Sequence, residues 1–101
     1  MEKIDFKEKL VNFLDNEGKL KNYPSKYKNK IYALFYLASK FEHGVKYSEM
    51  EVNNILNKWH NFGDWAMLRR DLYDKKIFNR TVDSKTYWLE TEPPSLEKLG
   101  L

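Results

Sequence analysis

Residues 47–80 read YSEMEVNNILNKWHNFGDWAMLRRDLYDKKIFNR, and most of the predicted architecture follows from this segment. Ser48 and Glu51 have the spacing of a capping box, which predicts that a helix begins there. Asp64 can cap a second helix, and only residues 60–63, which include a glycine, separate the two helices. Two helices joined by such a short turn are typical of a helix-turn-helix.

Apolar side chains recur in both predicted helices at the three- and four-residue spacing of one helix face. The first helix is expected to end near residue 59 and the second near residue 75. Because an amphipathic helix packs its apolar stripe against the core, the following side chains are predicted to be inside: Val52, Ile55, Leu56 and Trp59 from the first helix, and Trp65, Leu68 and Leu72 from the second.

The residues after the second helix predict a β-hairpin. Residues 77–81 and 86–90 are rich in β-branched and aromatic side chains, and residues 82–85 separate them. Upstream of the capping box, residues 45–47 predict a short strand. The two prolines at 93–94 are expected to end the structured part, with a short tail after them.

Two further helices are predicted before residue 45. The first runs from Asp5 to Gly18, because Glu8 completes a capping-box spacing and a glycine can end a helix in a left-handed conformation. The second runs from about Lys26 to Phe41, and its apolar stripe contains Tyr27, Ile31, Leu34, Ala38 and Phe41.

The order of helix, short strand, helix, turn, helix and hairpin is that of a winged helix. We therefore predict a mostly α fold with a small β-hairpin, an α+β winged helix-turn-helix. In it, residues 1–18 add an N-terminal helix and residues 91–101 form the tail. The 101 residues have the length of one domain, and no linker divides them.

Composition excludes several classes of protein. The chain has no cysteine, which excludes disulfides, a thiolate zinc site and a cysteine nucleophile. No apolar run approaches the ~20 residues needed to span a bilayer. Charges occur throughout residues 1–14, unlike in a secretory signal. A soluble, cytoplasmic protein without membrane contact is therefore expected.

No catalytic or cofactor-binding motif is visible. His43 and His60 lie in different predicted loops, are expected at the surface or an interface, and do not form a metal-binding pair. The serines lack a nucleophile elbow, and the four glycines form no phosphate-binding loop. We therefore expect a non-catalytic protein that uses no metal or cofactor.

The net charge of +3 is unevenly distributed. Residues 1–47 carry ten lysines and six acids, whereas residues 48–101 carry eight basic residues and nine acids. Between Gly18 and Phe41 there are six lysines and no acid. Such a patch can bind phosphates, because neutralising a phosphate releases counterions. The alternative is that these lysines only keep a helix face soluble.

The helix before the hairpin is the candidate for reading DNA, because this helix of a winged helix enters the major groove. Arg70 points almost directly away from the apolar stripe, which makes it the best candidate to pair with guanine. Asp71 and Asp74 lie on or near the same exposed half, where carboxylates repel phosphates. The residues predicted to contact DNA are Lys26, Lys28, Lys30, Arg69, Arg70, Tyr73, Lys75, Lys76, Arg80 and Lys85.

Two of the polar side chains in the predicted helix pair have structural alternatives. Arg69 could pair with an acid on the neighbouring helix, either Glu49 or Glu51, instead of with DNA. Asn53 lies beside the apolar face of its helix, where a buried amide is expected to fix a loop by hydrogen bonds.

Three segments together resemble a known family: GKLKNYPSKYKNKIYALFYLASKF at residues 18–41, the segment 47–80 quoted above, and YWL at residues 87–89. They are similar to an uncharacterised domain often fused C-terminal to ArsR-type winged-helix transcriptional regulators of bacteria, which also occurs alone. The resemblance takes residues 19–90 as the family core. It implies a regulator-associated domain of winged-helix type and no established activity. Its motifs are specific in combination: Tyr47-Ser48-Glu49, Glu51-Val52-Asn53 and Leu68-Arg69-Arg70.

We therefore expect a small, non-catalytic, DNA-binding bacterial transcriptional regulator whose partner is double-stranded DNA. We expect no separate DNA-binding domain before Met1, so the domain would bind DNA itself or act with another regulator protein. The alternative is a protein-interaction or dimerisation module of winged-helix fold that does not bind DNA. Tyr87 and Trp88 alternate along a strand, so one faces inward and the outward one could belong to a homodimer interface.

Overall fold

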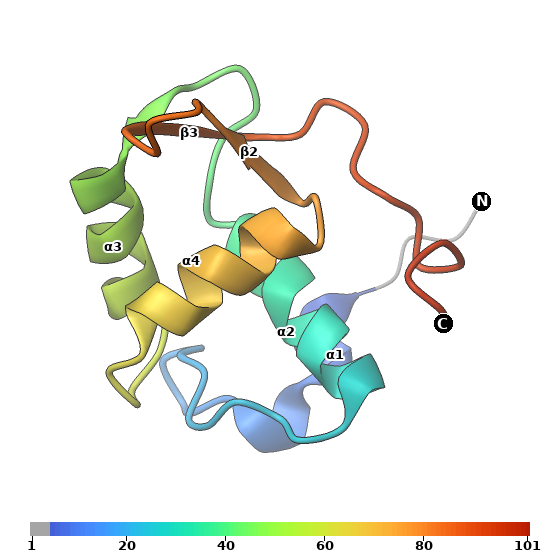
Figure 1. The fold of residues 1–101 in the computed structure, drawn as a ribbon. Helices are drawn as coiled ribbons and strands as arrows, with labels where there is room; N and C mark the ends of the chain where they lie inside the picture. The colour runs from blue at the N-terminus through green and yellow to red at the C-terminus, as the bar shows by residue number, and fades with distance from the viewer. Residues whose placement is uncertain (1–4) are drawn as a thin grey trace.

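The computed structural model describes residues 5–101, which form an α+β fold of helices and one small sheet (Figure 1). The start of the predicted N-terminal helix, residues 1–4, lies outside the described residues. The elements in chain order are α1 (Phe6–Lys9), the 3-10 helix η1 (Val11–Phe13), α2 (Tyr27–Ala38), β1 (Tyr47–Ser48), α3 (Glu49–Lys58), α4 (Trp65–Asp74), β2 (Phe78–Arg80) and β3 (Thr86–Leu89).

The sheet is antiparallel, with β3 between β1 and β2. Tyr87 of β3 pairs with Tyr47 on one side and with Arg80 on the other. The predicted hairpin is therefore confirmed, and the predicted short strand lies slightly later in the chain. Tyr87 is 3 % exposed and faces the core, whereas Trp88 is only partly buried. The predicted alternation of these two side chains is confirmed.

The capping box of α3 is also confirmed. The Glu51 N–H donates to Ser48 Oγ at 3.1 Å, and the Ser48 N–H donates to Glu51 Oε1 at 2.8 Å. Helix α4 follows Asp64 as predicted, but the Asp64 side chain forms no capping hydrogen bond. The Asp64 N–H donates instead to the ring of His60. The turn between the helices is therefore held by the His60 ring and not by the predicted Asp64 cap.

His60 is buried, with 4 % of its surface exposed, so the expectation of a surface or interface histidine is wrong. Its Nδ1 lies 2.6 Å from the carbonyl oxygen of Leu56, and its Nε2 accepts from the Asp64 N–H at 2.9 Å. Only a neutral imidazole with its proton on Nδ1 satisfies both contacts. The ring therefore joins the last turn of α3 to the start of α4. His43 is exposed.

The predicted helix over residues 5–18 is wrong beyond its first turn. Asp5 does cap α1, since its carboxylate accepts from two backbone N–H groups, but α1 ends at Lys9. The Asp15 carboxylate then accepts from the backbone N–H groups two and four residues later, each at 2.9 Å. Such a local hydrogen bond favours a turn over a helix, and it reverses the chain near Gly18, whose φ is +81°.

This reversal brings Leu20 against the turn between α3 and α4. The Leu20 N–H donates to the carbonyl oxygen of Trp59, and the Asn61 N–H donates to the Leu20 carbonyl oxygen, both at 2.9 Å. Leu20 itself is fully buried. The backbone of Leu20 therefore bridges the residues on either side of His60.

The core lies between α2, α3, α4 and the inner face of the sheet. Leu56, Leu68 and Leu72 are fully buried, as predicted. Trp65 is 38 % exposed, so its predicted place in the core is wrong. Trp65 is the first residue of α4, and the helix becomes buried only one turn later, at Leu68.

The chain after the prolines folds back onto the protein, so the predicted end of structure at residues 93–94 is wrong. Leu96 and Leu99 are partly buried and pack against the core. The Tyr27 hydroxyl donates to the Leu99 carbonyl oxygen at 2.7 Å. Tyr27, which was predicted in the apolar stripe of α2, is 44 % exposed. It contacts the C-terminal tail instead.

Replacing the buried imidazole tests its role in the turn. We expect His60→Ala to lower the free energy of unfolding by about 1–3 kcal/mol, because it removes a buried ring with two hydrogen bonds and leaves the partly buried Asp64 N–H without this partner. Urea denaturation measures the change. His43→Ala is the control and should stay within about 0.5 kcal/mol of the parent protein. Equal stability of the parent and His60→Ala would show that the ring does not hold the turn.

Candidate functional site

A hollow of about 350 Å³ lies between the outer face of α4 and the hairpin, and we call it the α4–hairpin hollow. In Figure 1, α4 crosses the front of the molecule and the hairpin lies above it. Four of the residues predicted to contact DNA meet here. The complete lining is Ala66, Arg69, Arg70, Tyr73, Asp74, Arg80 and Tyr87.

Arg80 is held in place within this hollow. The centre of its guanidinium lies 4.2 Å from the centroid of the Tyr73 ring, a cation–π contact. Its Nη1 donates to Ser84 Oγ at 2.5 Å, across the hairpin turn. Hydrogen bonding with the hydroxyls of Tyr73 and then Tyr87 raises the pKa of Arg80. The guanidinium is thus a fixed cation with a restricted orientation.

Arg69 links α4 to α3. It forms an ion pair with Glu49 at 3.2 Å and donates to Asn53 Oδ1. The alternative predicted for Arg69, pairing with Glu49, is confirmed. The amide of Asn53 does form a hydrogen bond, but it fixes a helix rather than the predicted loop. The side chain of Arg69 is 19 % exposed, so most of it belongs to the helix interface.

Arg70 and Asp74 are both exposed on the outer face of α4. Over residues 5–101, the pair of Arg69 and Glu49 is the only ion pair within 4.0 Å. The guanidinium groups of Arg70 and Arg80 therefore have no carboxylate partner in that range. Within the α4–hairpin hollow, these are the two cations available to a ligand.

Asp71 does not face outward freely, in contrast to the expectation from the sequence. The Tyr23 hydroxyl donates to Asp71 Oδ2 at 2.7 Å. Burial, followed by the hydrogen bond to Asp71, raises the pKa of Tyr23 above its usual value. No sequence signal indicated this contact, because 48 residues separate the two side chains.

Two of the predicted lysines line one hollow beside α2. Lys30 and Lys75 line a second hollow of about 210 Å³. The Nζ of Lys30 lies 5.3 Å from the Tyr23 ring, and the Nζ of Lys75 lies 5.0 Å from the Tyr27 ring. Lys26 and Lys28 are exposed at the start of α2 and Lys85 is exposed at the hairpin tip, but these three line none of the hollows described here.

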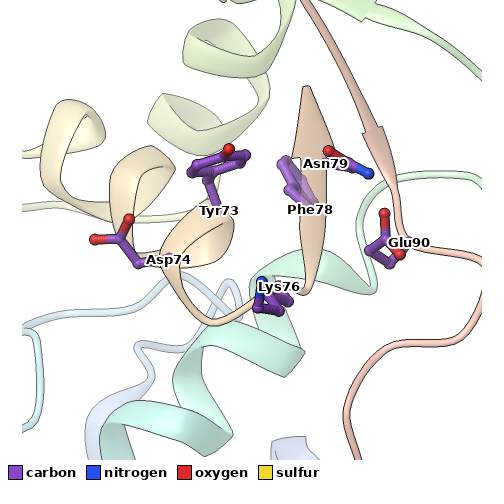
Figure 2. A pocket seen from close by; sticks show the side chains of 6 residues that line it. All are labelled: Tyr73, Asp74, Lys76, Phe78, Asn79 and Glu90. Carbon is purple, nitrogen blue, oxygen red and sulfur yellow. The ribbon is translucent and has the colours of Figure 1, made fainter. Parts of the chain in front are cut away.

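Lys76 occupies the turn after α4, with a left-handed φ of 61°. It lines a third hollow of about 270 Å³ together with Asp74 and Glu90. Figure 2 shows the rings of Tyr73 and Phe78 between these two carboxylates. The acids counter the charge of Lys76, so this hollow is less suited to an anion than the α4–hairpin hollow.

The described residues contain neither a metal-binding cluster nor a membrane-spanning helix. No three histidine, aspartate or glutamate side chains in residues 5–101 gather to hold a metal ion. No helix in the same range is both long and apolar enough to cross a membrane.

These features define a small α+β protein whose candidate site is a partly basic groove between a helix and a hairpin. The model of a family described as uncharacterised proteins conserved in bacteria (DUF2087) matches residues 19–89, and the chain belongs to this family. The predicted membership of an uncharacterised bacterial domain family is thus confirmed, with nearly the same boundaries. No curated protein and no solved structure gave a match.

The contacts of Arg69 generate a prediction about the α3–α4 interface. Double-mutant cycles should give a coupling of about 1 kcal/mol between Arg69 and Asn53, because their hydrogen bond is partly buried. The coupling between Arg69 and Glu49 should stay below about 0.5 kcal/mol and fall with salt, because Glu49 is half-exposed. Urea unfolding of the alanine variants measures both. A larger coupling energy between Arg69 and Glu49 than between Arg69 and Asn53 would contradict this prediction.

The contact between Tyr23 and Asp71 predicts a loss of stability in alkali. The pKa of Tyr23 is raised in the folded state, so its contribution is present below the unfolded value of about 10 and is lost as the pH rises above it. Stability should fall less steeply in Tyr23→Phe between about pH 9 and pH 11. Burial also raises the pKa of Tyr36. Part of the dependence of stability on pH should therefore remain in the Tyr23→Phe variant. Urea unfolding across this range tests this, and an unchanged slope would contradict it.

Proposed function

We propose that this chain is a small regulator that binds double-stranded DNA through a winged helix. The observation that carries the proposal is the element order α2, β1, α3, α4, β2, β3 with the strand order β1-β3-β2. In this arrangement α4 takes the place of the second helix of a helix-turn-helix, which enters the major groove. The hairpin takes the place of the wing.

The side chains on the open face of α4 support this assignment. Arg70 is exposed and has no carboxylate partner within residues 5–101, so its fork is free to pair with guanine O6 and N7. Asp74, one turn along, is also exposed, and a carboxylate can accept from cytosine N4. Tyr73 lies beside them and stacks with Arg80.

The remaining predicted residues would contact the DNA backbone. Phosphate contacts orient a protein on the duplex without reading the bases. Arg69 stays chiefly structural in this proposal because of its contacts with α3. The residues assigned to phosphates are Lys26, Lys28, Lys30, Lys75, Lys76, Arg80 and Lys85.

The contact between Tyr23 and Asp71 changes which acid of α4 is exposed. From the sequence, the helix that carries Arg70 has as many acidic as basic side chains. Because Asp71 accepts a hydrogen bond from Tyr23, Asp74 is the only fully exposed carboxylate within α4. The outer face of α4 therefore presents one exposed acid, Asp74, beside one free arginine, Arg70, since Arg69 pairs with Glu49.

The family resemblance supports a regulatory setting. A domain that occurs fused to ArsR-type regulators would act in the bacterial cytoplasm, in transcription, alone or with another regulator protein. The protein-interaction or dimerisation module remains the second candidate, and the exposed Trp65 and Met50 favour it. A homodimer would fit either function.

Fluorescence anisotropy of labelled duplex DNA at two salt concentrations tests the proposal. We expect mixed-sequence duplex to bind in the micromolar range and to dissociate steeply as salt increases. Lys28→Ala should weaken all duplexes alike and reduce the salt slope by about one. After selection of a preferred site, Arg70→Ala should weaken that site by about 1–3 kcal/mol.

Lys9→Ala is the matched control. Lys9 is an exposed lysine on α1, which packs against α2, and it is not among the residues assigned to DNA. It should leave both affinity and salt slope unchanged. Absence of binding at low salt by the folded protein would refute the DNA-binding proposal. Sedimentation of the same sample would then test the dimerisation module.

A further inference from the structure

The α4–hairpin hollow places two cations on opposite walls. Arg70 extends from α4 on one side, and Arg80 extends from β2 on the other. Neither has a carboxylate within 4.0 Å among residues 5–101. A guanidinium presents its donors in a planar fork that matches carboxylate or phosphate oxygens. One anion in the hollow could therefore accept hydrogen bonds from two guanidinium groups on different sides.

Arg80 is already oriented for such a ligand. The Tyr73 ring covers one face of its guanidinium, and Ser84 Oγ accepts from its Nη1. Ser84 is itself fixed in a left-handed conformation at φ 62° in the hairpin turn. Restricting a long side chain before binding reduces the entropy lost when the ligand arrives.

The charges around the hollow favour an anion. Of the three arginines in its lining, only Arg69 has a carboxylate partner, which is Glu49. Asp74 is the single carboxylate in the lining. Because Glu49 offsets Arg69, the hollow is left with the two positive charges of Arg70 and Arg80 against the one negative charge of Asp74. Tyr87 contributes a further polar group beside Arg80.

We propose that the α4–hairpin hollow binds a phosphate group, with Arg80 as the fixed donor and Arg70 as the closing donor. A phosphate has more acceptor oxygens than a carboxylate and can carry more negative charge, so it suits two separate guanidinium groups better. This inference deepens the proposed function, on which it rests for one of two ligand sources. Those sources are a backbone phosphate of DNA and a free phosphorylated small molecule.

The first arm of the test uses inorganic phosphate. It is titrated into the ¹⁵N-labelled protein at constant ionic strength, and the backbone amide and arginine Nε–H signals are followed by NMR. We expect saturable shifts at Arg70, Arg80 and Tyr73. Arg80→Gln should weaken binding by about tenfold, as loss of a hydrogen-bonded charge does.

Lys46→Gln is the matched control, because it removes one positive charge from an exposed lysine whose Nζ lies 5.7 Å from the Trp88 ring of the same sheet, outside the hollow. It should change phosphate affinity by less than about twofold. Arg70→Gln, at an exposed position, provides a second variant should Arg80→Gln fail to fold. Equal effects of the arginine and lysine variants, or shifts spread evenly over the surface lysines, would overturn the inference.

The second arm repeats the comparison with duplex DNA. A larger loss in Arg80→Gln than in Lys46→Gln supports the hollow with the DNA backbone as the source of phosphate. Saturable phosphate binding without duplex binding supports the hollow with a small phosphorylated ligand and refutes the DNA-binding proposal. Duplex binding that falls equally in both variants overturns the inference and leaves the DNA-binding proposal standing.

Discussion

The two hydrogen bonds of His60 set the geometry on which the candidate site depends. The imidazole accepts from the N–H of Asp64, the residue directly before α4, while its other nitrogen contacts the carbonyl of Leu56 in the last turn of α3. Because the ring is buried and rigid, it fixes where α4 starts relative to α3. That placement determines which side of α4 meets the core, through Leu68 and Leu72, and which side remains open.

Electrostatics on the open side depend on tertiary partners more than on composition. Arg69 and Arg70 are neighbours in sequence, yet one is bound to Glu49 and Asn53 and the other is free among the described residues. Asp71 is similarly engaged by Tyr23. Counting charges along the helix therefore misjudges the field that a ligand meets. The effective face of α4 consists of Arg70 and Asp74, with Arg80 contributed by the hairpin.

Local signals predicted the helices and the hairpin, whereas long-range contacts escaped prediction. The capping box at Ser48 and the helical spacing of Leu68 and Leu72 act within a few residues, so the sequence displays them directly. The turn at Asp15 competes with a helix of equal apparent quality and prevails because the chain gains the bridge at Leu20. The burial of His60 depends on a segment 40 residues away, which no local pattern encodes. Arg80 was predicted as a contact, but its stacking with Tyr73 was not.

The backbone bridge at Leu20 bears on how such a module can be reused. The segment shared with the family begins at Lys19, one residue before the bridge that ties Trp59 and Asn61 together. The shared segment therefore carries, in one continuous stretch, every backbone contact that bridges the turn between α3 and α4. The turn at Asp15, which brings Leu20 to the bridge, lies outside the match. Recombination with a neighbour that supplies an equivalent turn would leave the angle of that helix pair intact. The geometry of the open face of α4 would then be preserved with the shared segment, while the elements outside the match could differ in sequence.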